Sequence, residues 1–441
     1  MSEAAIKSNH TTYNLQSWSK QRGLNPIVIE RAKGIYLWDP SGKRYSDMSS
    51  QLVNMSLGHG NEAIIEAIEK QAKTYCFVAP SYASEARGEL AKLLVSLLPD
   101  TIGKVFFTNG GADANENAVK MARMYTGKNK VFSRYRSYHG SSFGAGNLTG
   151  EPRRYALEPG IPGFVKFFDP YIYREKISFP SETAATEHYL YKLREQIIYE
   201  NPDNVAALVL ETITGSNGVI IPPEGYLAGV RKICDELGVL LICDEVMTGF
   251  CRTGKMFAFE HYGVKPDIVT FAKGVTCGYV PLGGVAVSKD IAAYFDDHLL
   301  SCGLTYSGHP LACAAGLACV TYYKEHNILT NVLERGKELA EIFDALKNRH
   351  ASVGDARCIG LFGAVELVRN KTTKEALVPY GKDPDGIMKK IIGELAARGF
   401  MTYSHENMFI VAPPLIITKE QLDEEMRKVD EVLAIVDVQI A

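Results

Sequence analysis

The chain has 441 residues, of which 46% are hydrophobic, enough apolar material for a large core divided between two or three domains. Its 48 basic and 51 acidic side chains nearly balance, which argues against a nucleic acid or a membrane surface as partner and favours a small-molecule substrate. The nine cysteines include no C-x-x-C pair and the N-terminus has no apolar signal-like stretch, so we expect a cytoplasmic protein without disulfides, zinc or a membrane span.

Residues 1–60 combine an irregular segment with short strand-like pieces and turns. From about residue 62 to 325, amphipathic helical patterns alternate with short apolar runs. The runs are nearly continuous rather than alternating, which predicts a mainly parallel sheet covered by helices on both faces. The predicted helices cover 62–75, 84–98, a stretch from 113 onward and 226–237, and the predicted strands cover 104–107, 130–133, 205–210, 239–243, 268–271 and 284–287.

After about residue 327 the pattern changes to helix, strands, helix, strand and helix, and Thr418–Gln421 forms a capping box for the last helix. This order is typical of an α+β arrangement. We therefore expect an α/β protein with a large doubly wound domain over residues 61–326 and a smaller α+β domain formed by residues 1–60 and 327–441.

Three predicted strands end in residues suited to chemistry, at the sheet edge where open α/β folds bind their ligands. The first is followed by Gly110, Gly111 and Ala112 and then by a helix. Glycines let the backbone approach a ligand closely, and the first amides of a helix attract anions, so a phosphate cradle is expected at Gly111 and Ala112. The alternative is a plain strand–turn–helix junction.

The other two strand ends carry charged side chains. Asp244 and Glu245 follow the strand at 239–243, where a carboxylate could bind a metal, act as a base, hold a protonated ring nitrogen or simply cap a helix. Lys273 follows the strand at 268–271, where partial burial would lower its pKa and free the amine for imine chemistry, unless it extends to solvent. A phosphate cradle, a ring-nitrogen acid and an imine lysine are together what pyridoxal 5′-phosphate requires.

From about residue 25 to the C-terminus, the sequence resembles the class III, or ω-amino-acid, aminotransferases of fold type I. Many ordered matches carry this resemblance, and it implies an enzyme that binds pyridoxal 5′-phosphate. The matching stretches are Gly34–Asp39, Leu57–Gly60, Asn109–Glu116, Tyr138–Gly140, Asp244–Phe250, Phe271–Gly274, Thr305–Pro310 and Pro413–Leu415.

The resemblance also implies residue roles. Lys273 would form the Schiff base and later move the proton, and Asp244 would keep the ring nitrogen protonated. In this family Thr305 reaches the phosphate of the neighbouring subunit, which implies a homodimer with shared active sites. The implied cofactor-binding residues are Gly111, Ala112, Tyr138, Glu211, Asp244, Val246, Lys273 and Thr305.

Some residues of these motifs have plainer expectations. His139 and His309 are expected to pack or cap rather than to catalyse, and Glu245 to order its neighbours. Several departures from the family matter. Gly110 and Ala112 stand where serines are common, and Met247 stands where ornithine- and γ-aminobutyrate-type members usually carry glutamine, which disfavours those two substrate classes.

The substrate pocket is less clearly marked. Residues 400–412 contain no arginine, although many amine transaminases grip a carboxylate there, and Tyr403 lies near the expected place. A buried anion needs a counter-charge, which Arg153, Arg154 or Arg136 could supply if they do not form surface ion pairs instead. Trp18 and Phe77 are candidates for an apolar wall.

Residues 150–174 look like those of aminotransferases that act on taurine. We therefore expect an amino donor such as taurine or a close ω-amino acid, and 2-oxoglutarate or pyruvate as the keto-acid acceptor, in a ping-pong reaction. The alternatives are an amine, β-alanine or diamine transaminase of the same family and, less favoured, an aminomutase-type isomerase on the same fold.

Overall fold

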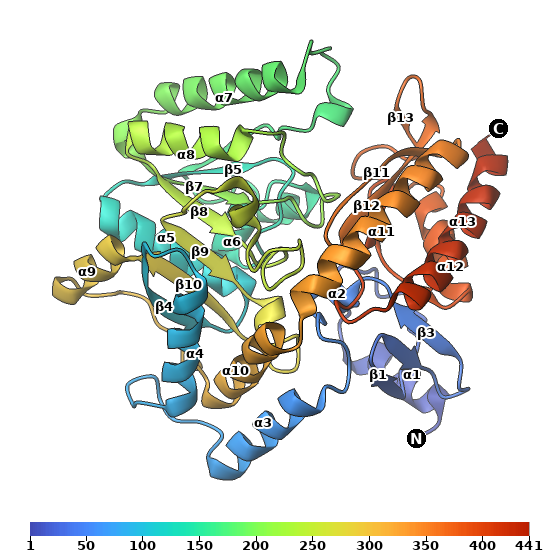
Figure 1. Cartoon of the computed structure of the whole chain (residues 1–441), viewed down its shortest axis with the longest axis horizontal. Coiled ribbons are helices and arrows are strands. Elements are labelled where there is room, and N and C mark those ends of the chain that lie inside the picture. Colours follow the sequence, from blue (N-terminus) through green and yellow to red (C-terminus); the bar gives the residue numbers. More distant parts are fainter. Residues whose placement is uncertain (441) are drawn as a thin grey trace.

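A seven-stranded sheet forms the centre of the larger part of the molecule (Figure 1) in the computed structural model, which describes residues 1–440. The strand order is β4-β10-β9-β8-β7-β5-β6. Neighbours from β6 to β9 pair in parallel, and β10 pairs antiparallel with both β4 and β9, so the expected mainly parallel sheet is confirmed. The strands are β4 (Ile102–Thr108), β5 (Lys130–Arg134), β6 (Phe164–Phe167), β7 (Val205–Glu211), β8 (Leu240–Asp244), β9 (Ile268–Phe271) and β10 (Gly283–Ser288).

Helices cover both faces of this sheet, and β7 shows why its sequence is a continuous apolar run. Ala207 and Val209 pack in the cluster that contains buried residues of α5 and α9, whereas Leu208 and Leu210 pack in the cluster of α4, α8 and α10. Both faces of β7 are therefore buried, as a central parallel strand requires. The helices of this part are α3 (Glu62–Thr74), α4 (Glu85–Leu97), α5 (Gly111–Thr126), α6 (Phe143–Leu148), α7 (Glu182–Tyr199), α8 (Tyr226–Leu237), α9 (Lys289–Asp297) and α10 (Pro310–Glu325).

The N-terminal and C-terminal parts of the chain both lie on the right of Figure 1 and share a sheet. One sheet joins β1 (Arg31–Lys33), β2 (Tyr36–Trp38) and β3 (Arg44–Asp47) to β14 (Phe400–Met401), which pairs in parallel with β3. A second sheet has the order β11-β12-β16-β15, with β13 beside β12. Its strands and the helices of this part are α11 (Ile328–Arg349), β11 (Val353–Ile359), β12 (Phe362–Asn370), β13 (Glu375–Ala376), α12 (Ile387–Ala397), β15 (Ser404–His405), β16 (Met408–Val411) and α13 (Lys419–Ile440).

The capping box before α13 is confirmed by a reciprocal pair of hydrogen bonds. The Gln421 amide donates to Thr418 Oγ1 (3.3 Å), and the Thr418 amide donates to Gln421 Oε1 (2.9 Å). The domain boundaries at residues 60 and 327 stay predictions.

The structure differs from the sequence-based expectation at several places. The N-terminal segment contains the helix α1 (Glu3–Tyr13), which has no buried residue and begins where Ser2 caps the Ala5 amide. Strand β6 was not expected at all, and α5 begins at Gly111, two residues before the predicted start. The short helix α2 (Ser50–Val53) was also unforeseen, and Gln51 within it has a positive φ of 59°.

No helix within residues 1–440 combines the length and the apolar character needed to cross a bilayer. Over the same residues, no group of His, Cys, Asp and Glu side chains is arranged to hold a metal ion.

Candidate active site

A cavity of about 450 Å³ lies at the sheet edge where β8 and β9 end. It contains seven of the eight cofactor-binding residues predicted from the sequence, and they come from five separate loops and strand ends. These residues are Gly111, Ala112, Tyr138, Glu211, Asp244, Val246 and Lys273.

Lys273 lies two residues beyond the end of β9, at the start of a short 3-10 turn, and its backbone has a positive φ of 45°. Burial lowers the pKa of its amine to about 8, and the nearby cations Arg153 and Arg252 act in the same direction. The carboxylates of Asp244 and Glu211 oppose that change. The amine is therefore available in its neutral form close to physiological pH.

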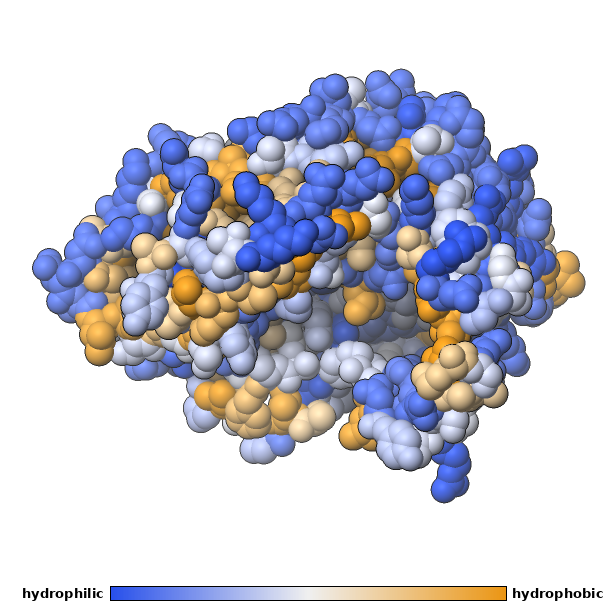
Figure 2. Space-filling view, turned by 90° about the horizontal axis from the view of Figure 1, so that it is seen from below, coloured by the Kyte–Doolittle hydropathy of each residue, from blue (hydrophilic) through white to orange (hydrophobic). Residues whose placement is uncertain are grey.

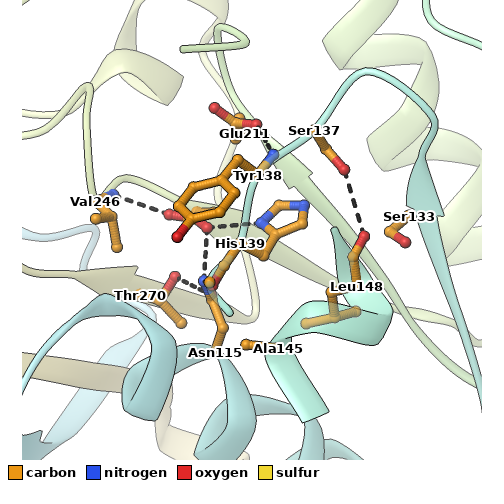
Figure 3. A network of polar contacts seen from close by, with 12 residues as sticks. Asn115, Ser133, Ser137, Tyr138, His139, Ala145, Leu148, Glu211, Val246 and Thr270 are labelled. Atoms are coloured by element: carbon orange, nitrogen blue, oxygen red, sulfur yellow. Dashed lines mark hydrogen bonds and ion pairs between the residues drawn. The ribbon is translucent and has the colours of Figure 1, made fainter. Parts of the chain in front are cut away.

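Asp244 ends β8 and is 3% exposed, held in a polar network that Figure 3 shows from close by. Its Oδ1 accepts from the Val246 amide (3.0 Å), and its Oδ2 lies 2.7 Å from both Asn115 Nδ2 and His139 Nδ1. Because a carboxylate is an acceptor, His139 carries its proton on Nδ1. His139 Nε2 is buried without a partner among residues 1–440.

Asn115 fixes this network from helix α5. Its Nδ2 also donates to the His139 carbonyl (2.8 Å), and its Oδ1 accepts from Thr270 Oγ1 (2.8 Å) on β9. Both amide hydrogens and the amide oxygen are thus engaged, so the Asn115 side chain has one orientation. Asn115 and Thr270 had no predicted role. His139, expected to pack or cap, instead binds the carboxylate of Asp244.

The start of α5 forms the other end of the cavity. Gly110 precedes the helix, and no side chain caps its first turn, so its first amides face the cavity region with the positive end of the helix dipole. Gly111 allows Val246 to pack closely, because a Cβ at this position would lie 2.9 Å from Val246 Cγ1.

Tyr138 and Glu211 line the same cavity and are joined through the backbone. The Tyr138 amide donates to Glu211 Oε1 (3.0 Å), and the Gly215 amide donates to Glu211 Oε2 (2.6 Å). Burial raises the pKa of Glu211, although its two amide donors and the neighbouring His139 favour the ionised form. Glu211 therefore fixes the position of the Tyr138 backbone.

Arg153 and Trp18 both pack against the Tyr138 ring. The Arg153 guanidinium carbon lies 3.7 Å from the centroid of the Tyr138 ring and 5.2 Å from that of Trp18. The Trp18 ring meets Tyr138 edge-on at 6.4 Å and is 61% exposed. Three predicted residues thus come together beside the cavity, with a cation among them.

The remaining predicted residues lie elsewhere. Phe77 packs against Tyr306 and His309, with ring centroids at 5.7 and 5.5 Å, and Thr305 beside Tyr306 is exposed. Neither Phe77 nor Thr305 lines the cavity. Tyr403 packs in a separate apolar cluster that includes Met247, and Met247 does line the cavity.

The two other candidate arginines are engaged with acids. Arg136 binds Glu406 (3.3 Å) and lies over the rings of Tyr171 and Tyr380. Arg154 binds Glu158. Arg153 is paired with Glu151 as well, but it is the arginine that lies against the cavity-lining Tyr138.

Two further expectations, on His309 and Glu245, agree with the structure. His309 caps α10, since its Nδ1 accepts from the Leu311 amide (3.2 Å). Glu245 is fully buried and accepts from two threonine hydroxyls and two backbone amides, which confirms that it orders its neighbours. Burial raises its pKa to about 7.

The donor set fits pyridoxal 5′-phosphate. An amine with a lowered pKa can link to its aldehyde, a fixed carboxylate can meet its ring nitrogen, and an uncapped helix start can bind its phosphate. Tyr138 and Val246 supply a ring and an aliphatic side chain at the cavity wall.

Comparison with known proteins decides the family. The model of the family described as aminotransferase class-III matches residues 18–433. The chain is a class III aminotransferase. As a member of this family it is a pyridoxal-phosphate-dependent enzyme of fold type I, and it exchanges amino groups between an amine donor and a keto-acid acceptor.

Similar proteins within the family differ in substrate. One solved structure is that of taurine:2-oxoglutarate aminotransferase from Bifidobacterium kashiwanohense, in complex with PLP and glutamate. Its sequence is 52% identical to that of this class III aminotransferase, and the two structures superpose with a TM-score of 0.98. The match covers 100% of this chain and 99% of that chain. A taurine–pyruvate aminotransferase of Bilophila wadsworthia is 31% identical over 95% and 94% of the two chains. A putrescine–pyruvate aminotransferase of Pseudomonas aeruginosa is 34% identical over 90% and 88%.

Proposed function

We propose that this aminotransferase moves the amino group of taurine, or of a close ω-amino acid, to 2-oxoglutarate or pyruvate. The position of Arg153 carries the proposal, because its guanidinium lies 3.7 Å from the Tyr138 ring and offers a cation beside the cavity to a sulfonate or carboxylate. The 52% identity to a taurine:2-oxoglutarate aminotransferase supports the same substrate class.

Lys273 is the proposed catalytic residue. When bound, pyridoxal phosphate supplies an aldehyde that links to amines and a ring that withdraws electrons from the attached carbon. The Lys273 amine, whose pKa burial lowers to about 8, would hold that aldehyde until a donor amine displaces it, and would then move the proton at the donor carbon. The same lysine would move the proton for donor and acceptor in turn.

The other cofactor-binding residues have proposed positioning roles. Asp244, held by Asn115 and His139, keeps the ring nitrogen protonated. The amides of Gly111 and Ala112 bind the phosphate at the start of α5, as helix N-termini do. Tyr138 and Val246 bracket the ring, and Glu211 holds the Tyr138 backbone in place.

The same family relationship leads us to propose a homodimer with shared active sites, in which Thr305 completes the phosphate site of the neighbouring subunit. Several observations support this. Thr305 is exposed and does not line the cavity of its own chain. Leu52 does line that cavity, yet its side chain is 68% exposed. Phe77 and Tyr306 are 39% and 56% exposed. Figure 2 shows apolar side chains beside a hollow on one face of the molecule, and such patches are usually covered by a partner.

A half-reaction tests the substrate. The holoenzyme, without keto acid, is mixed separately with taurine, β-alanine, γ-aminobutyrate and putrescine, and the visible absorbance of the lysine-bound cofactor is followed. We expect taurine to bleach it fastest. Arg153→Gln should slow the taurine reaction about 10- to 100-fold, because one hydrogen bond to a charged group is lost. The same variant should change the rate with putrescine far less.

If taurine leaves the absorbance unchanged while putrescine bleaches it, the enzyme is a diamine transaminase and the taurine proposal is wrong. A single isomeric amine formed with no need for a keto acid would instead identify an aminomutase.

A further inference from the structure

Arg153 has a dedicated counter-charge, and that counter-charge is buried. Glu151 precedes the short 3-10 helix Pro152–Leu157, is 1% exposed, and accepts from Arg153 Nε through its Oε1. Arg153 Nη2 donates to Ser216 Oγ (3.2 Å), whereas its Nη1 has no hydrogen-bond partner among residues 1–440. One edge of the guanidinium is thus fixed and one donor is left for a ligand.

Glu151 has Arg153 as its one cationic partner at neutral pH among the described residues. Its Oε2 faces His405 Nε2 at 3.7 Å, but burial, together with the cations Arg153 and Arg136, lowers the pKa of His405 to about 4. The imidazole is therefore neutral at pH 7. Arg136 is paired with Glu406.

A substrate anion therefore meets a cation that already has a carboxylate partner. Two anions then share one guanidinium, and the buried Glu151 competes with the ligand for it. In the proposed reaction, each half-reaction starts and ends with a molecule that carries the same anionic group, so an arginine without a counter-charge would hold substrate and product equally tightly.

We propose that Glu151 is a specificity-determining residue: its carboxylate is the counter-charge that stays on Arg153 and competes there with the sulfonate or carboxylate of the substrate. The Arg153–Glu151 pair selects an anionic substrate and binds it weakly enough for the product to dissociate. This inference rests on the proposed function, since it takes Arg153 as the partner of that anion.

The test measures binding of isethionate, 2-hydroxyethanesulfonate, which has the sulfonate of taurine but no amine to react. Its Kd for the holoenzyme is determined by calorimetry. Glu151→Gln keeps an acceptor for Arg153 Nε but removes the competing charge, so the Kd should fall about tenfold, the scale of one charge-assisted hydrogen bond. With taurine as substrate, KM and kcat should both fall, because the product leaves more slowly.

Two further variants distinguish the effect of the negative charge on Glu151 from the effect of losing a contact with Arg153. Ser216→Ala removes an uncharged partner of Arg153 and should not lower the Kd of isethionate. Glu151→Asp keeps the charge but withdraws it by one methylene, and the Kd should fall about threefold, less than in Glu151→Gln. Glu151→Asp also keeps the test decisive should the glutamine variant fail to fold.

An unchanged or raised Kd in both Glu151 variants would overturn the role of Glu151. An equal fall in Ser216→Ala would do the same, because any loosening of Arg153 would then suffice. If Arg153→Gln binds isethionate as tightly as the parent enzyme, the proposed function loses its anion-binding residue, which is a separate failure.

Discussion

Two adjacent glycines at the start of α5 have different tasks. A Cβ at Gly111 would lie 2.9 and 3.0 Å from the two Cγ atoms of Val246, whereas a Cβ at Gly110 would meet nothing within 4 Å. The φ of Gly110 is 175°, an extended conformation that any residue adopts. The close approach of helix and cavity wall therefore depends on Gly111.

Gly111→Ala should weaken retention of pyridoxal phosphate about tenfold, because the added methyl group displaces Val246 or the first turn of α5, at a cost of about 1–3 kcal/mol. The Kd of the cofactor, measured by quenching of protein fluorescence on adding it to the apoprotein, checks this. Gly110→Ala is the matched control and should retain the parent Kd. Equal Kd values for the two variants and the parent would contradict a phosphate cradle at Gly111.

At the level of single residues, sequence reasoning identified groups whose chemistry is unusual for their place. Lys273 and Asp244 follow apolar strands, and Gly111 precedes a helix, so each could be recognised locally and the structure places all three at one cavity. Asn115 and Thr270 could not be found in this way. Their contact joins α5 to β9 across the sheet, and only the three-dimensional packing brings the two side chains to 2.8 Å.

At the level of elements, contacts within its own chain do not account for the exposed motif residues of segment 301–309. It carries the exposed Thr305 and Tyr306, and Phe77 from another loop packs on Tyr306 at 5.7 Å. A segment with family motifs but no contact with its own cavity is consistent with a role in a neighbouring subunit.

We expect analytical ultracentrifugation to give about twice the chain mass of 48.6 kDa. Thr305→Ala should raise the Kd of pyridoxal phosphate about 10- to 100-fold, because a hydrogen bond to a charged phosphate is lost. Ser301→Ala, on the same segment, serves as the control and should have no effect. A monomer that binds the cofactor with undiminished affinity would contradict the shared site.

Most elements of the larger part could be predicted, because β7, β8 and β9 are continuous apolar runs and α8 begins and ends where its pattern does. The element α1 could not, since it buries no residue and therefore has no apolar stripe to mark it. Strand β6 is a short edge strand of four residues that pairs only with β5, and such a strand has a weak sequence signal.

At the level of the whole molecule, the parallel sheet explains how residues distant in sequence form one site. The ends of β8 and β9 lie at one edge, with the start of α5 beside them, so Gly111, Asp244 and Lys273 meet although 162 positions separate the first from the last. We expect Lys273 to carry the cofactor at that edge.

Borohydride reduction followed by peptide mapping shows which lysine carries the cofactor. Reduction of the holoenzyme should fix pyridoxal phosphate to one peptide, with the label on Lys273. Because the amine has a pKa of about 8 and reacts only when neutral, capture of the cofactor by the apoprotein should rise as the pH passes upward through about 8. Label on any other lysine, or no label on Lys273 at any pH, would contradict the account.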